Sequence, residues 1–115
     1  MNREGSLRFD EKGLIPAVIQ DAFSQQVLML GWMNREALEL TRSTGLVHFW
    51  SRSRRRLWKK GETSGNLMQV VEISVDCDRD ALLVRVLRKG PACHTGMVTC
   101  FHNPMDEENE NHAIS

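Results

Sequence analysis

The sequence predicts an α+β fold made mostly of antiparallel strands with one or two short helices. Several strand-like segments follow one another with little helix between them, which is typical of α+β domains rather than of a doubly wound sheet. The 115 residues match the size of one domain. The hydrophobic fraction of 41% and the charged fraction of 26% are ordinary for a folded chain, so disorder throughout is excluded.

Two strands and a helix are predicted in the first half. Residues 14–21 are apolar, and Pro16 makes this segment an edge strand or the start of a strand, because proline lacks the N–H that pairs with a neighbour. Residues 26–33 form a second strand candidate. Asn34 can cap a following helix through its side-chain oxygen, and Gly45 suits a left-handed helix end.

The second half predicts three more strands and one long loop. Residues 46–51 form a strand with aromatic side chains, and residues 51–66 are polar and form a long loop. Residues 68–75 and 82–88 alternate between apolar and polar side chains, and their short connection favours an antiparallel pair. The apolar positions are Val71, Ile73 and Val75 in the first and Leu82, Val84 and Val86 in the second.

Charge is balanced over the chain but uneven along it. Fifteen basic and fifteen acidic residues give no net attraction to nucleic acid or to an anionic membrane. We expect residues 1–104 to form one domain and residues 105–115 to be an acidic, disordered tail. The chain has no apolar run of about 18 residues and no hydrophobic leader, so we expect a cytoplasmic protein. Six basic side chains cluster within nine positions: Arg52, Arg54, Arg55, Arg56, Lys59 and Lys60.

Three aspartates recur at spacing two in the motif D-C-D-R-D. In an extended chain, Asp76, Asp78 and Asp80 share one face, and three packed anions need a cation. Carboxylate oxygens favour hard ions such as Mg²⁺ or Ca²⁺. A polar turn with solvated acids is the alternative. Cys77 lies between two of these aspartates and so points to the opposite face of an extended chain. The thiol and the acids are therefore predicted to serve different sites.

Three cysteines with the spacing C-x15-C-x6-C make a metal site or a chemical site the leading hypothesis. Their odd number argues against a closed disulfide framework. Thiolates from Cys77, Cys93 and Cys100 suit Zn²⁺ and leave one coordination position. If His94 or His102 fills that position the site is structural, and if water fills it the site is catalytic. His94 could instead act as an acid or base, and the thiols could simply fill core space.

Taken together, five segments resemble the phosphoribosyl-AMP cyclohydrolases, enzymes of the third step of histidine biosynthesis. They are LGWMNREAL (30–38), FWSRSR (49–54), LWKKGETSGN (57–66), VDCDRDALLV (75–84) and GPACHTG…CF (90–101). The resemblance implies hydrolytic opening of the purine ring between N1 and C6, giving a formimino aminoimidazole carboxamide ribotide. Because the chain ends soon after Phe101, we expect the pyrophosphohydrolase domain fused to some relatives to be absent.

The same resemblance implies roles for individual residues. It assigns Zn²⁺ to Cys77, Cys93 and Cys100, Mg²⁺ to Asp76, Asp78 and Asp80, and proton transfer to His94. It also implies an intertwined homodimer in which Cys77 comes from one subunit and the other two cysteines come from its partner.

The basic segment is the candidate for binding the two phosphates of the substrate. Arg52, Arg54 and Lys60 lie in the resembling motifs, and Ser64, Gly65 and Asn66 offer loop donors. Arg55, Arg56 and Lys59 are expected on the solvated surface. The competing hypothesis is a zinc-stabilised binding module whose basic loop and aromatic residues stack single-stranded nucleic acid. Zero net charge counts against it.

Overall fold

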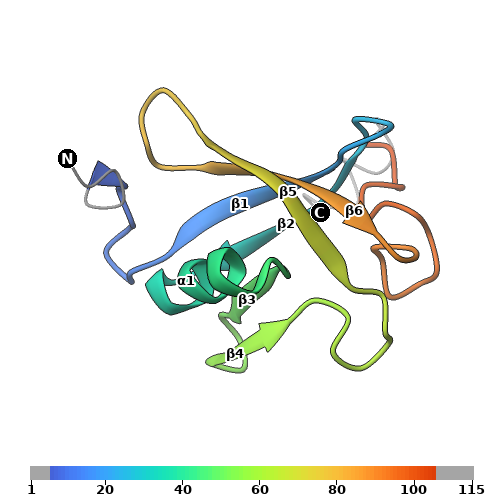
Figure 1. Ribbon diagram of the computed structural model, residues 1–115, viewed down its shortest axis with the longest axis horizontal. Coiled ribbons are helices and arrows are strands. Elements are labelled where there is room, and N and C mark those ends of the chain that lie inside the picture. Colours follow the sequence, from blue (N-terminus) through green and yellow to red (C-terminus); the bar gives the residue numbers. More distant parts are fainter. Residues whose placement is uncertain (1–5, 106–115) are drawn as a thin grey trace.

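The computed structural model describes residues 6–105, which fold into two sheets and one helix. The four-stranded sheet has the order β2-β1-β6-β5, and β3 pairs with β4. Figure 1 shows α1 and the β3–β4 hairpin on the same side of the larger sheet. The elements are β1 (Ile15–Asp21), β2 (Val27–Met33), α1 (Arg35–Thr44), β3 (His48–Ser51), β4 (Arg56–Lys59), β5 (Met68–Val75) and β6 (Leu82–Arg88).

This arrangement confirms the α+β prediction with mostly antiparallel strands. Strand pairs β1–β2, β3–β4 and β5–β6 are antiparallel, while β1 and β6 are parallel. Within residues 6–105, no helix is long and apolar enough to cross a membrane. The predicted acidic tail lies outside the described residues apart from Met105.

Strand β1 lies inside the sheet, so the prediction of an edge strand was wrong and the alternative of a strand start is confirmed. Pro16 pairs only with Trp32 of β2, because pairing with β6 begins at Ala17. The proline therefore stands where no N–H is needed on the β6 side.

The core lies between the larger sheet and the α1–β3–β4 layer. The Phe49 ring packs on Gly31, where an added Cβ would lie 2.4 Å from the ring carbon Cε1. Glycine at this position therefore lets β2 and β3 approach each other. The buried strand residues include Ile15, Ala17, Ile19, Leu82, Val84 and Val86, as the alternation along β6 predicts.

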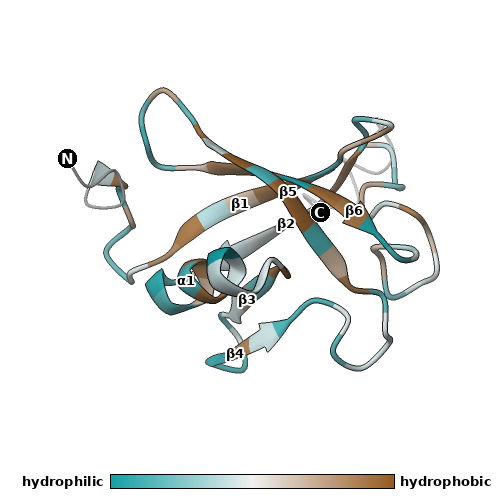
Figure 2. Ribbon diagram, in the orientation of Figure 1, coloured by the Kyte–Doolittle hydropathy of each residue, from teal (hydrophilic) through white to brown (hydrophobic). Residues whose placement is uncertain are grey.

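Helix α1 begins and ends as its sequence predicts. Asn34 Oδ1 accepts a hydrogen bond of 2.8 Å from the Ala37 N–H. Gly45 has φ 74° and donates its N–H to the Thr41 carbonyl. Figure 2 shows both hydrophilic and hydrophobic residues along the helix, and its buried side includes Leu38.

The prediction of a continuous loop over residues 51–66 was wrong in its middle. Strand β4 forms there, because Trp58 pairs across the hairpin with Phe49 and their ring centroids lie 5.0 Å apart. Arg55 takes φ 54° in the turn between the two strands. A basic segment can therefore form a strand when one aromatic side chain packs against the core.

The predicted apolar face of β5 is broken by a bulge. The pairing register shifts between Val70 and Glu72, and Val71 is 54% exposed. Val70 and Ile73 both pack against the core although their parity differs. Because the bulge adds one residue, even-numbered side chains such as Val70 face the core before it and odd-numbered ones such as Ile73 face the core after it.

A strained glutamine in the β1–β2 turn gives a stability prediction. Gln25 has φ 64°, a conformation that costs a side-chain-bearing residue about 1–2 kcal/mol. Glycine avoids that cost, but it lowers the free energy of unfolding by about 0.5–1 kcal/mol because it has more conformational freedom to lose on folding. We expect Gln25→Gly to raise the free energy of unfolding by about 0.5–1 kcal/mol in urea titrations. Equal or lower stability would contradict this account.

Candidate active site

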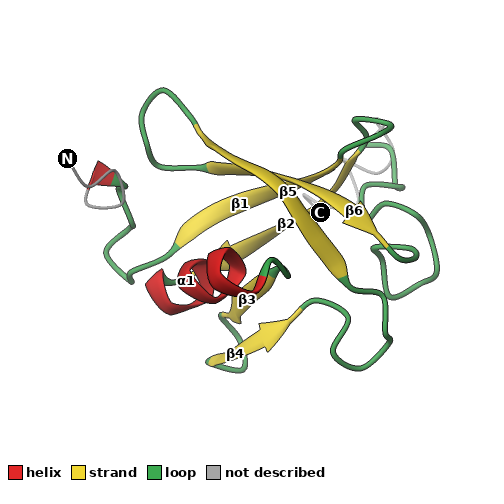
Figure 3. Cartoon of the chain, in the orientation of Figure 1, coloured by secondary structure: helices red, strands yellow, loops and turns green. Residues whose placement is uncertain are grey.

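Two loops and the β3–β4 hairpin enclose a pocket of about 470 Å³, called here the site pocket. Its walls come from the hairpin, the loop after β4 and the loop after β6. Figure 3 shows these two loops as long connections. Predicted site residues on the wall are Arg54, Lys60, Ser64, Asn66, Cys93 and His94. Arg52 and Gly65 do not line it.

Packing and hydrogen bonds hold the two loops together. Gly90 faces the Asn66 side chain so closely that an added Cβ would lie 2.5 Å from Oδ1. The Lys60 ammonium donates a hydrogen bond of 2.6 Å to the Ala92 carbonyl. The basic segment is thereby fixed beside the segment that carries Cys93 and His94.

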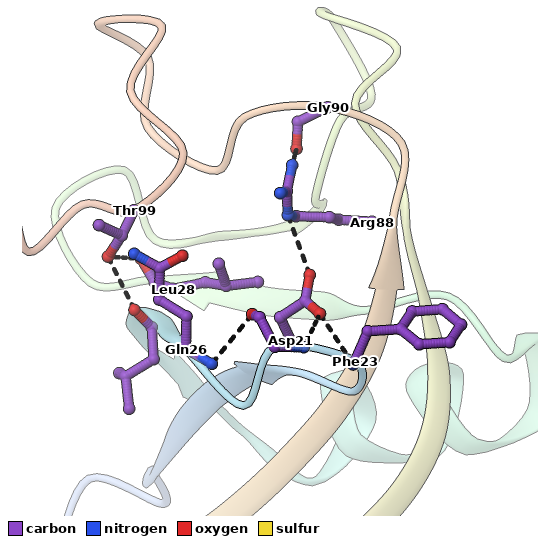
Figure 4. Close-up of polar contacts among 9 residues, drawn as sticks. Asp21, Phe23, Gln26, Leu28, Arg88, Gly90 and Thr99 are labelled. Atoms are coloured by element: carbon purple, nitrogen blue, oxygen red, sulfur yellow. Dashed lines mark hydrogen bonds and ion pairs between the residues drawn. The ribbon is translucent and has the colours of Figure 1, made fainter.

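The loop after β6 is anchored at both ends, as Figure 4 shows. Arg88 Nε donates to Asp21 Oδ2 at 3.0 Å, and Arg88 Nη1 donates to the Gly90 carbonyl at 3.2 Å. At the other end, Thr99 Oγ1 donates to the Leu28 carbonyl at 3.1 Å. These contacts tie the cysteine-bearing loop to the ends of β1, β2 and β6.

Cys93 and Cys100 lie side by side in this loop. The Thr95 hydroxyl donates to Cys93 Sγ at 3.0 Å, and His102 Nε2 lies 3.7 Å from the same sulfur. The hydrogen bonds from Thr95, with a smaller effect of His102, lower the pKa of the Cys93 thiol to about 6. Burial and the neighbouring Cys93 raise the pKa of Cys100. The Cys93 thiol therefore ionises at a lower pH than the Cys100 thiol.

Cys77 is far from this pair within one chain. It is exposed in the β5–β6 turn, at the opposite end of β6 from the loop that carries Cys93. Seven residues of extended strand span roughly 20 Å. Accordingly, no three Cys, His, Asp or Glu side chains among residues 6–105 converge on a common metal position.

The predicted aspartate motif is a tight turn rather than an extended chain. Asp76 Oδ1 accepts the N–H groups of Asp80 and Ala81, and Arg79 has φ 63°. Strict alternation of side chains, on which the one-face argument rested, does not hold here.

The carboxyl groups of Asp76 and Asp80 still come together by hydrogen bonding. Desolvation of the carboxyl group opposes ionisation of the exposed Asp76, but the hydrogen bonds from Asp80 and Ala81 outweigh it and lower its pKa. The contact with Asp76 raises the pKa of Asp80, which also faces the charge of Asp78.

The basic residues divide differently from the prediction. Arg56 and Lys59 line the site pocket; Arg56 is still exposed to solvent, as predicted, while Lys59 is half-buried. Arg56 is held by an ion pair of 3.3 Å with Glu62. The cause is strand β4, which aligns this part of the chain along the pocket. Arg52 instead places its guanidinium 4.6 Å from the centre of the Trp32 ring.

Three functional candidates were missed by the sequence argument. Thr95 follows Cys93 by two residues, a spacing that allows a hydroxyl-to-sulfur contact within one turn. Asp21 and Arg88 come together only because β1 and β6 are parallel neighbours, and no local pattern signals that contact.

Asp21 gives a pH-dependent prediction for the anchor. The Ser24 N–H, together with that of Phe23 and the Arg88 guanidinium, outweighs burial and lowers the pKa of Asp21 below its ordinary 3.8. Its stabilisation is therefore complete above that value and is lost as pH falls through the lower folded pKa. We expect Asp21→Asn to reduce the free energy of unfolding by about 1–3 kcal/mol at pH 7. The difference should shrink below about pH 4 in urea titrations, and a constant difference would contradict this account.

The chain has extensive similarity to known proteins. Residues 29–102 match the phosphoribosyl-AMP cyclohydrolase family. The chain is 59% identical over 100 residues to the phosphoribosyl-AMP cyclohydrolase of Archaeoglobus fulgidus, covering 87% of this chain and 93% of that protein. It is 58% identical over 97 residues to the enzyme of the same name from Dinoroseobacter shibae, covering 84% of this chain and 82% of that protein.

A longer relative carries the same region. The chain is 59% identical over 104 residues to the histidine biosynthesis bifunctional protein HisIE of Caldanaerobacter subterraneus. The matched region is 90% of this chain but spans about half of that relative, 51% of its length. These matches cover the site pocket, the aspartate turn and all three cysteines, and this chain belongs to the phosphoribosyl-AMP cyclohydrolase family.

Proposed function

We propose that this chain hydrolyses phosphoribosyl-AMP, opening the purine ring between N1 and C6. One observation carries the proposal: a family member folds so that Cys93, His94 and several cationic side chains share one pocket. Family membership favours this enzyme over the module for single-stranded nucleic acid. The expected cytoplasmic location stays a prediction.

The pair of Cys93, which lines the site pocket, and Cys100 beside it fits zinc. Cys93 and Cys100 present two soft sulfur donors side by side, and thiolates are preferred ligands of Zn²⁺. We propose that these two, with Cys77, hold the ion. When bound, such an ion supplies a water molecule whose pKa is lowered to about 7.

The chain's own residues position the substrate and move a proton. Water adds to C6 of the purine ring, the N1–C6 bond breaks, and N1 takes up a proton. His94 lies on the pocket wall next to Cys93, so its imidazole is the group proposed to deliver that proton. Lys60, fixed on the Ala92 carbonyl, and Arg54 supply positive charge for a phosphate.

Two loop positions are proposed to complete this phosphate contact. Ser64 and Asn66 lie on the pocket wall and offer polar side chains. The N–H of Gly65 between them already donates to the Gly61 carbonyl at 2.7 Å, so Gly65, with φ 81°, shapes the turn rather than donating to the phosphate.

The aspartate turn is proposed to bind Mg²⁺. Asp76 and Asp80 are held together by hydrogen bonding, and the charge of Asp78 adds to the repulsion there. A hard divalent cation would relieve that repulsion and accept carboxylate oxygens as ligands.

A homodimer with a shared zinc site is also proposed. The length of β6 keeps Cys77 away from Cys93 and Cys100 of its own chain, so all three can meet only if another chain supplies Cys77. Exposed apolar residues on the sheet face away from α1 fit burial against a second copy, among them Leu87 at 38% exposure.

The test of the function is direct. Purified protein loaded with zinc is incubated with phosphoribosyl-AMP, and the loss of the purine chromophore is followed together with the mass of the product. We expect a product heavier than the substrate by one water molecule. The matched control is Cys93→Ser protein, which should lose zinc and activity together because oxygen replaces a soft ligand. An intact purine ring after incubation with zinc-loaded wild-type protein would refute the function.

A further inference from the structure

A second pocket of about 530 Å³ adjoins the site pocket, and it contains Arg52. It lies along strand β2, which forms one edge of the larger sheet, and reaches the β3–β4 hairpin. Ser51 and Trp58 line both pockets, so the hairpin forms a common wall between them. Other lining residues of this Arg52 pocket are Lys12, Trp32, Trp50 and Ser53.

Arg52 is arranged to receive an anion. Its guanidinium lies 4.6 Å from the centre of the Trp32 ring, and stacking of this kind orients the guanidinium plane while its N–H groups stay open at the edge. Lys12 adds a second positive charge to the same pocket. No ion pair between residues 6 and 105 includes either side chain. A phosphate would therefore find two available cations.

Hydroxyl groups supply neutral donors in the same place. Ser51 and Ser53 both line the Arg52 pocket, and their Oγ atoms lie 3.5 Å apart. Ser51 Oγ already accepts the Arg54 N–H, which directs its own proton elsewhere. Cations, hydroxyls and flat aromatic walls are the features that suit a phosphorylated sugar.

We propose that the Arg52 pocket binds one of the two phosphoribosyl arms of the substrate, while the site pocket holds the purine ring and the other arm. This inference rests on the proposed function. The arms leave the purine at N1 and N9, on opposite sides of the ring system, so their phosphates point apart. Two adjoining pockets with separate cations match that shape, with Arg54 and Lys60 in one and Arg52 and Lys12 in the other.

Fragments that carry one arm each separate the two pockets. AMP contains the purine and the N9 arm, and ribose 5-phosphate stands in for the N1 arm. Their dissociation constants are measured by calorimetry for wild type, Arg52→Ala and Arg54→Ala. We expect Arg52→Ala to weaken one fragment by about 10- to 100-fold and Arg54→Ala to weaken the other, the usual effect of losing a charge-assisted hydrogen bond. Which fragment responds to Arg52 identifies the arm.

Two further variants sharpen the test. Arg35 lies 4.4 Å from the centre of the Phe9 ring in the same kind of stack but lines neither pocket, so Arg35→Ala should leave both constants unchanged. Arg52→Lys keeps the charge without the planar fork, and we expect an intermediate loss for the same fragment. It also carries the test if Arg52→Ala does not fold.

Several results would overturn the inference. The first is that Arg52→Ala and Arg52→Lys bind both fragments as wild type does. The second is that the Arg52 and Arg54 variants lose affinity for the same fragment. The third is that wild type binds neither fragment. Failure of the proposed function is seen separately, as absence of ring opening by the zinc-loaded wild-type protein.

Discussion

Replacing His94 with alanine is expected to lower turnover of phosphoribosyl-AMP by about 10²–10⁴-fold, the usual contribution of a general acid or base. His94 lies on the wall of the site pocket next to Cys93, so the substrate can reach its imidazole. Zinc content should stay near that of wild type, because the three thiolates proposed to hold the ion are unchanged. Steady-state rates and metal analysis of the same preparation check both parts.

The two nearby histidines can be told apart by the same measurements. His102 Nε2 lies 3.7 Å from Cys93 Sγ, so His102→Ala tests the alternative that an imidazole completes the metal site. His48 serves as the matched control, because it lies in β3 and does not line the pocket. Loss of zinc from His94→Ala would make His94 a ligand and favour the closed, structural site over the catalytic one.

Regular alternation and helix capping made much of the fold predictable. The β6 pattern gave its buried face, and Asn34 and Gly45 marked the helix ends as the structure has them. These patterns depend on neighbouring residues alone, so they predict the structure correctly wherever tertiary contacts do not change the local conformation. Alternation failed at Val71, where a bulge adds one residue, and at Asp76–Asp80, where a turn replaces the extended chain. Neither irregularity has a strong residue signal.

The site was predictable to the extent that it is local in sequence. Cys93 and His94 are adjacent in the chain, so their joint placement on one pocket follows from the motif. The sequence could not predict that Arg52 and Arg54 line different pockets. Their placement depends on the geometry of the β3–β4 hairpin and on the contact of Arg52 with Trp32, which is distant in sequence. The Asp21–Arg88 anchor likewise depends on the parallel pairing of β1 with β6.

Mixing two inactive variants is expected to restore about a quarter of wild-type activity if the zinc site is shared between subunits. Homodimers of Cys77→Ser and of Cys93→Ser each lack one thiolate in both sites, so both should be inactive. In a mixed dimer, one site combines the two lesions and the other keeps all three thiols. Random pairing of equal amounts makes half of the dimers mixed, and half of their sites are intact.

The separation of the cysteines along β6 is the physical basis of this expectation. Because Cys77 lies at the far end of that strand from the loop of Cys93 and Cys100, the two ends of one chain contribute to different sites, and both lesions of a mixed dimer fall in the same site. Coexpression with two affinity tags isolates the mixed dimers, which should show about half of wild-type activity and half of its zinc. The control is coexpression of Cys93→Ser with Cys100→Ser, whose lesions fall in the same half of the site. That pair leaves every site with a lesion and should restore nothing. Purified mixed dimers of the first pair without activity would exclude a shared site, because a site built within one chain carries its own lesion in every dimer.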